Sequence, residues 1–107
     1  VLLGALALGI DSMIGITTNL FGVIDNKIVE SFQQGSFNDA RRYQAQLQRG
    51  MAIITQNGQV PLISGFKAAM KLAGLDCGPA RTPLGGVSEE VSTRICSQLT
   101  THLMNFN

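Results

Sequence analysis

The chain has 107 residues, of which 45% are hydrophobic and only 14% are charged. Soluble domains usually carry about 25% charged residues, so this chain is unusually poor in charge. Because it is rich in apolar residues, it can bury enough surface to fold and is not expected to be intrinsically disordered. Its net charge of +1 excludes the strongly basic surfaces that bind nucleic acid or acidic lipid, so neither is expected as a partner. Cys77 and Cys96 are too few for a disulfide scaffold, fit a reducing compartment, and lack the spacing of metal ligands.

Residues 1–10 (VLLGALALGI) form a continuous apolar run. A membrane span needs about 20 such residues, and the basic flank and small-residue cleavage site of a signal peptide are not visible. We therefore predict the buried end of a helix, terminated by Gly9. The missing targeting run and the unpaired cysteines together favour a cytoplasmic location.

A second apolar run, at residues 13–17 (MIGIT), is short and partly β-branched, which predicts a buried strand. Polar Thr17, Thr18 and Asn19 mark its carboxyl end. One strand cannot form a sheet, because its backbone donors and acceptors need neighbouring strands. We therefore expect the other strands to come from residues before Val1 or from another chain, and the sequence to be an incomplete domain. An opening valine in place of methionine points the same way.

The rest of the sequence predicts four helices, each with apolar residues at three- and four-residue steps. Their expected bounds are residues 22–35, 36–58, 61–74 and, after a loop rich in Gly and Pro at 75–87, from 88 onward. Ser88 is expected to cap the last helix. Glu89 and Glu90 then lie in its first turn, where the helix dipole favours acidic side chains.

Three motifs follow one another along the chain. Residues 9–19 read GIDSMIGITTN, residues 32–45 read FQQGSFNDARRYQA, and residues 67–84 contain KAAM and GLDCGPARTPL. In this order they resemble G-A-x-G-x-I-G/S-x-T-x-N, F-x-x-G-D-x-x-x-A-x-x-x-Q and K-A-x-x…G-x-x-x-G-P-x-R-x-P-L of the N-acetylneuraminate lyase and dihydrodipicolinate synthase superfamily. The resemblance covers nearly the whole chain, since the Ser88-Glu89-Glu90 cap also matches.

The resemblance implies an α/β fold in which this chain is the C-terminal piece of a (β/α)8 TIM barrel followed by a helical extension. Residues 1–35 would supply the last helix, strand and helix of the barrel, and residues 36–107 the extension, so the chain itself would be mostly α-helical. Family members are commonly homotetramers, and the resemblance implies a homotetramer for the full-length protein.

The family's reaction is a class I aldolase cleavage of a small-molecule 2-oxo acid or sialic acid. A lysine forms a Schiff base with the ketone, which serves as the electron sink, and a tyrosine relays the proton. The resemblance implies no metal, nucleotide or organic cofactor. The lysines of this chain and Tyr43 all lie on predicted helices. In the family, the catalytic lysine and tyrosine come from earlier strands of the barrel. The resemblance therefore implies that both lie upstream of Val1, and we expect this chain alone to be inactive.

Gly15 and Ile16 are the predicted substrate-binding residues. They lie near the carboxyl end of the last strand, where barrel enzymes place their active sites. A glycine there lets substrate approach the backbone closely. The alternatives are that Gly15 only permits tight packing of the barrel and that Ile16 is a core residue. Leu62 and Ile63 match the border of the site's mouth only loosely.

Three functions remain open from the sequence. The spacing between Asn19 and Arg49 is more like that of animal N-acetylneuraminate lyases, which cleave N-acetylneuraminate to N-acetylmannosamine and pyruvate. Ile16 instead favours a dihydrodipicolinate synthase or another pyruvate-dependent aldolase, because lyases usually show G-S-T-Y-N at this strand. The third is a truncated, non-catalytic helical interaction module, which should not need a strand without partners.

Overall fold

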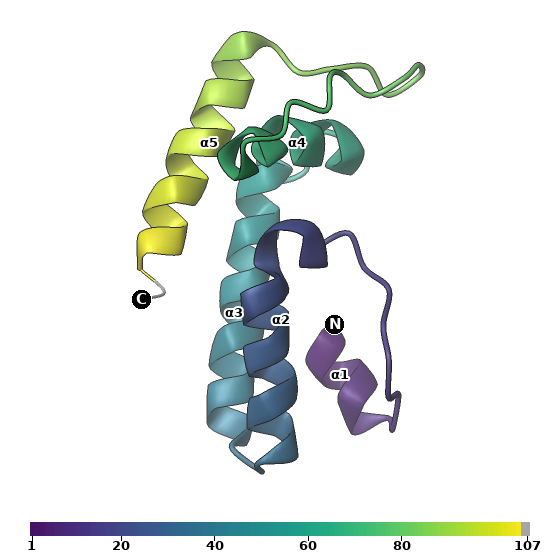
Figure 1. Ribbon diagram of the computed structural model, residues 1–107, viewed down its shortest axis with the longest axis vertical. Coiled ribbons are helices and arrows are strands. Elements are labelled where there is room, and N and C mark those ends of the chain that lie inside the picture. Colours follow the sequence, from purple (N-terminus) through teal and green to yellow (C-terminus); the bar gives the residue numbers. More distant parts are fainter. Residues whose placement is uncertain (106–107) are drawn as a thin grey trace. The chain divides into compact units, whose positions relative to one another are not determined.

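The computed structural model describes residues 1–105, and the regular elements of that range are all helices (Figure 1). In chain order they are α1 Leu2–Ala7, α2 Thr18–Gln33, α3 Phe37–Ile54, α4 Leu62–Ala69, the 3₁₀ helix η1 Met70–Ala73 and α5 Glu89–Met104. The chain divides into two compact units, Val1–Arg49 and Gly50–Asn107, so that the boundary falls within α3.

The predicted strand at residues 13–17 does not form in this chain. The segment is irregular and ends in a turn before α2. Met13 and Ile14 are exposed, Ile14 completely, whereas Gly15 and Ile16 are half-buried. A strand forms only where a neighbour accepts and donates its ladder hydrogen bonds, and residues 1–105 contain no other strand. The apolar pattern is therefore present without the partner that would bury it.

The first unit is built on the apolar face of α2. Phe21, Ile24 and Ile28, three or four residues apart, are each at most 4% exposed. The helix begins before the predicted Gly22, because the Thr17 carbonyl already accepts hydrogen bonds from the amides of residues 20 and 21. Phe21 has a non-helical φ of −115°, so the predicted start coincides with a kink in the helix.

Helix α1 contacts α2 but contains no buried residue, so the prediction of a buried helix end is wrong for this chain. The backbone amide of Leu3 donates to the Gln44 side-chain carbonyl on α3 at 3.0 Å. The predicted terminator is confirmed: Gly9, just after the helix, has a φ of +82°, a conformation that glycine adopts without strain.

The core of the second unit comes from three helices. Ile54 at the end of α3, Phe66 on α4, and Ile95 and Leu99 on α5 are each at most 3% exposed. Gly65 lies on the buried face of α4, directly against the backbone of Ile54. A side chain at this position would meet the Ile54 carbonyl, so the close approach of the two segments depends on glycine.

Two predicted boundaries of the second unit are confirmed and one is shifted. The Ser88 hydroxyl accepts a hydrogen bond from the Val91 amide at 3.3 Å and caps α5. Gly74 ends η1 with a φ of +74°. Helix α3 ends at Ile54, before the predicted residue 58, because Gln56 and Asn57 have positive φ angles of 46° and 57° that a helix cannot contain.

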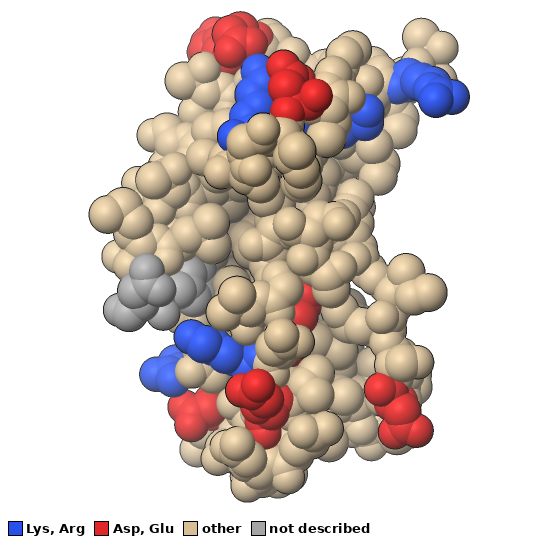
Figure 2. Space-filling model, viewed as in Figure 1, with Lys and Arg blue, Asp and Glu red and all other residues tan. Residues whose placement is uncertain are grey.

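Charged side chains form small groups on the face seen in Figure 2, separated by uncharged surface. The structure contains three ion pairs between exposed or half-exposed partners in its described part: Arg42–Asp39, Lys71–Glu89 and Arg94–Glu90. Pairs of this kind contribute about 0–1 kcal/mol each. The fold therefore depends mainly on its apolar contacts.

Candidate functional site

The two predicted substrate-binding residues lie at the turn that leads into α2. The Thr18 hydroxyl donates to the Gly15 carbonyl at 2.6 Å, a side-chain bond that threonine commonly makes at the end of a segment. The backbone amide of Asn19 donates to the Ile16 carbonyl at 3.3 Å, as in a tight turn. The turn has a defined backbone even though the predicted strand is not paired.

The missing side chain at Gly15 makes room for a neighbour within the chain. A Cβ added there would lie 3.3 Å from the Thr17 hydroxyl oxygen and 3.6 Å from the terminal methyl carbon of Met13. The first separation is shorter than most contacts made by Cβ atoms. A side chain at Gly15 would therefore crowd the Thr17 hydroxyl, and the role of Gly15 toward substrate stays a prediction.

A buried acid that the sequence analysis missed contacts the same turn. The Thr17 hydroxyl donates to Oδ2 of Asp25 on α2 at 3.3 Å, and Asp25 is only 4% exposed. Its Oδ1 atom is buried and has no hydrogen-bond partner among the described residues. Burial raises the pKa of Asp25, and the hydrogen bond from Thr17 opposes that shift. The signal was present in the sequence, since Asp25 follows Phe21 by four residues on the apolar face of the helix.

Replacing Asp25 by asparagine in this chain is expected to increase stability at neutral pH. A carboxyl whose pKa is higher in the folded than in the unfolded state stabilises the fold below the unfolded pKa of about 4. That contribution is lost as the pH rises through the folded pKa. Asparagine can still accept the Thr17 hydrogen bond but carries no charge, so D25N should match the parent near pH 3 and exceed its unfolding free energy at pH 7.

Urea denaturation of the parent and D25N between pH 3 and pH 7 measures this difference. Asp11→Asn, at an exposed position of the same unit, is the control and should follow the parent throughout. Superimposable pH profiles for the parent and D25N would show that Asp25 does not titrate in a buried environment.

The first unit also contains an apolar hollow of about 190 Å³. It is lined by α1, by residues 10–13 and by the last two turns of α2, including Val29 and Phe32. Neither Gly15 nor Ile16 lines it. The predicted site residues thus lie on a turn and not in a cavity of this chain.

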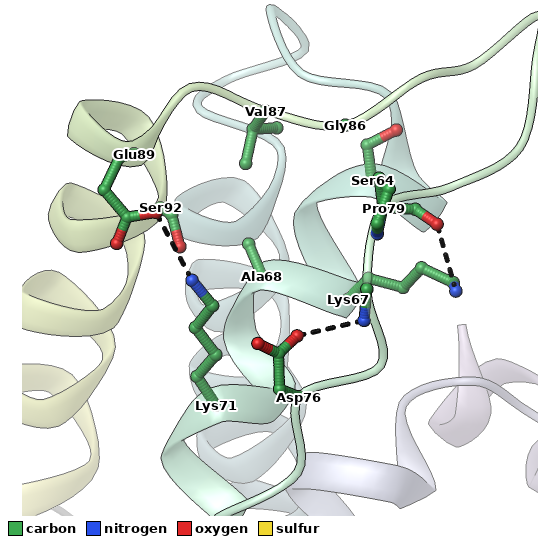
Figure 3. A pocket seen from close by; sticks show the side chains of 11 residues that line it. Ser64, Lys67, Ala68, Lys71, Asp76, Pro79, Gly86, Val87, Glu89 and Ser92 are labelled. Atoms are coloured by element: carbon green, nitrogen blue, oxygen red, sulfur yellow. Dashed lines mark hydrogen bonds and ion pairs between the residues drawn. The ribbon is translucent and has the colours of Figure 1, made fainter.

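A more polar cavity, of about 250 Å³, lies in the second unit among α4, η1, the loop at 75–87 and the start of α5 (Figure 3). The Lys67 ammonium donates to the carbonyls of Cys77 at 3.0 Å and Pro79 at 3.3 Å. The Lys71 ammonium pairs with the Glu89 carboxylate at 3.5 Å. Both lysines are therefore engaged within the protein, and the first of them fastens the loop to α4.

The other limb of this loop is held from the same helix. The Ser64 hydroxyl, on a residue only 2% exposed, donates to the Gly85 carbonyl at 2.8 Å. Near the first limb, the Asp76 carboxylate accepts a hydrogen bond from the Gly78 amide at 3.0 Å. The Gly- and Pro-rich loop is thus anchored at two places on α4, by Lys67 on one limb and by Ser64 on the other.

Lys67→Met is expected to loosen this loop. The variant keeps much of the apolar stem but loses both hydrogen bonds to the loop carbonyls. A net loss of about 1 kcal/mol would raise the open population about five-fold. Limited trypsin digestion should then cleave about five-fold faster after Arg81, which is exposed within the loop.

Lys71→Met is the matched control, because it removes a lysine one turn away that makes only a surface ion pair. The rate of cleavage after Arg81, followed by mass spectrometry, should stay near that of the parent in this control. Equal rates in both variants and the parent would mean that Lys67 does not hold the loop.

Two further kinds of site are absent from residues 1–105. That range contains no group of three or more His, Cys, Asp and Glu side chains placed to hold a metal ion. It also contains no helix with the length and apolar character needed to cross a bilayer. Cys77 and Cys96 are both free thiols, and burial raises the pKa of Cys96.

Comparison with known proteins matches the Dihydrodipicolinate synthetase family to residues 1–102. The chain is 37% identical to human N-acetylneuraminate lyase over 90 residues, which are 83% of this chain and 28% of that protein. It is 33% identical to the Rattus norvegicus N-acetylneuraminate lyase over 99 residues, which are 92% of this chain and 30% of that protein. It is also 33% identical to Xenopus laevis N-acetylneuraminate lyase A over 84 residues, which are 78% of this chain and 27% of that protein. No solved structure gives a significant match. The chain spans less than a third of these relatives' length, and it belongs to the dihydrodipicolinate synthetase family.

Proposed function

We propose that this chain is the C-terminal part of an enzyme that cleaves N-acetylneuraminate to N-acetylmannosamine and pyruvate through a Schiff base. The observation that carries the proposal is the identity of 31–37% to vertebrate proteins named N-acetylneuraminate lyase, over 78–92% of this chain. In this proposal, residues 1–35 complete a TIM barrel and residues 36–107 form its helical extension.

The state of the segment before α2 supports a place for it in a larger sheet. Ile10, Met13 and Ile14 are exposed large apolar residues of this segment, and contiguous exposed apolar surface usually marks a contact with more protein. Residues 11–14 make no hydrogen bond to the other described residues. An apolar segment with free backbone groups is what a strand presents when its neighbours are absent.

The surroundings of the lysines support a catalytic lysine elsewhere in the protein. A Schiff-base lysine must be unprotonated near neutral pH, which requires a desolvated site. Lys27, Lys67 and Lys71 are half-buried or exposed. Lys27 lies 5.5 Å from the centre of the Tyr43 ring, and the other two are held by the loop carbonyls and by Glu89. The proposed role of this chain is therefore to provide a wall of the substrate site, at Gly15 and Ile16.

A second candidate is a dihydrodipicolinate synthase or another pyruvate-dependent aldolase. Ile16 favours it, because a serine usually stands at this position in the lyases that the chain resembles. Ile16→Ser in the full-length protein tests whether this position contacts the substrate of a lyase. For a lyase, the added hydroxyl should lower the KM for N-acetylneuraminate about two- to ten-fold, the effect of one hydrogen bond. An unchanged or higher KM would argue that Ile16 does not contact this substrate.

The test of the proposed function starts from the transcript upstream of Val1 and continues with the purified full-length protein. The proposal expects an upstream strand lysine and strand tyrosine, and equal amounts of pyruvate and N-acetylmannosamine released from N-acetylneuraminate. The lysine and tyrosine without this cleavage would favour another aldolase. A start codon directly upstream of Val1 would favour the non-catalytic interaction module. The homotetramer and the cytoplasmic location stay predictions.

A further inference from the structure

Gly15, Thr17 and Asp25 of the first unit lie next to one another, from the proposed substrate-binding turn to the buried face of α2. The Thr17 hydroxyl oxygen lies close to Gly15, 3.3 Å from where a Cβ would stand, and donates to Asp25 at 3.3 Å. The Thr17 carbonyl in turn accepts the Phe21 amide at 2.7 Å. Thr17 is thereby fixed at its backbone and at its side chain, and its position limits where the backbone of Gly15 can lie.

Asp25 is incompletely satisfied in this arrangement. A carboxylate has about four acceptor sites, yet among the described residues Asp25 accepts a single hydrogen bond, at Oδ2 from the Thr17 hydroxyl. Its Oδ1 is buried and has no hydrogen-bond partner among residues 1–105, and the residue as a whole is only 4% exposed. Buried polar atoms nearly always have a partner, because leaving one unpaired is costly. Asp25 stands between Phe21 and Ile28 on an apolar face, where an acid has no packing advantage.

We propose that Asp25 is a positioning residue of the substrate site, which holds the Gly15–Ile16 backbone in place through Thr17 and accepts at Oδ1 a hydrogen bond from another part of the complete protein. The partner is a hydrogen-bond donor that reaches α2: a hydroxyl, an amide or a cationic side chain. The proposal rests on the proposed function. Asp25 does not contact substrate, so it acts on the reaction only through the turn.

The experiment compares Thr17→Val, Asp25→Leu, their double variant and Thr17→Ser in the full-length protein. Each of the first two should lower kcat/KM for N-acetylneuraminate about 10- to 100-fold, as expected for a buried hydrogen bond that loses a partner. The double variant should be no worse than Asp25→Leu alone, because the two side chains act as one unit. Thr17→Ser keeps the hydroxyl and should recover most of the activity lost in Thr17→Val.

A purely structural role makes different predictions. It would lower the melting temperature and the folded fraction of each variant but leave kcat and KM of the folded protein unchanged. That result, or losses that multiply in the double variant, would overturn the proposal. Should Asp25→Leu not fold, the pair Thr17→Val and Thr17→Ser gives the same decision.

A second readout does not depend on activity. If Oδ1 has a donor in the full-length protein, D25N places an amide group against that donor and should lower the melting temperature at pH 7, the opposite of its expected effect in this chain. An unchanged or higher melting temperature would overturn the second contact. If the parent protein releases no pyruvate, the proposed function fails, and with it the role at the substrate site, whereas a lower melting temperature of D25N would still establish the contact.

Discussion

Gly65→Ala is expected to lower the free energy of unfolding by about 3 kcal/mol, or to prevent the second unit from folding. A Cβ at this position would collide with the carbonyl oxygen of Ile54 and would lie 3.0 Å from that residue's Cγ2 atom and 3.1 Å from its carbonyl carbon. Ile54 is the last residue of α3 and is completely buried, so its backbone cannot move without disturbing the core. Urea denaturation followed by circular dichroism measures the loss.

The matched control is Gly22→Ala on α2. No atom outside the immediate backbone lies within 4 Å of a Cβ added there, and alanine is the better helix former by about 1 kcal/mol. The control should therefore keep or raise the denaturation midpoint. A Gly65→Ala variant as stable as the parent would mean that α4 does not approach Ile54 as closely as the structure shows.

Ile28→Ala is expected to destabilise the first unit by about 2–5 kcal/mol, the range for truncating a buried aliphatic side chain. Ile28 is 0% exposed and belongs to the apolar face of α2 with Phe21 and Ile24. The loss combines the transfer free energy of the removed carbons with the cavity left behind. Urea denaturation measures this loss of unfolding free energy, followed by a spectroscopic signal that comes from residues of the first unit.

Val23→Ala on the same helix is the control, because Val23 is 70% exposed. It should change the free energy of unfolding by no more than about 0.5 kcal/mol. Equal losses for Val23→Ala and Ile28→Ala in this chain would contradict the assignment of the buried face. A large loss for Val23→Ala in the full-length protein alone would instead place Val23 against residues outside this chain.

The helices were predictable because their signals are local. Apolar spacing located α2 to α5, and single residues such as Ser88 and Gly74 fixed ends that the structure confirms. Helix α3 ends at Ile54 and not at the predicted residue 58, because Gln56 and Asn57 adopt positive φ angles that are usually found at glycine. A hydrogen-bonded turn after Ile54 favours this conformation, including the bond from the Asn57 amide to the Ala52 carbonyl at 2.9 Å.

The strand and the site were less predictable, because both depend on distant groups. Residues 13–17 have a strand-like composition, but pairing is decided by neighbours that these residues do not specify. Lys67 was placed on a helix, yet its contacts to Cys77 and Pro79 follow only from how the loop returns to α4. Asp25 could have been noticed as an acid on an apolar face. Its hydrogen bond to Thr17 required the geometry of the turn.

Trapping the Schiff base tests the proposed function most directly. The full-length protein is incubated with pyruvate and sodium borohydride, which reduces the imine to a stable secondary amine, and the modified lysine is located by peptide mass spectrometry. We expect a mass increase of one pyruvate, less one water and plus two hydrogens, on a lysine upstream of Val1. An adduct on Lys27, Lys67 or Lys71, or a protein that forms no adduct, would contradict the proposed function.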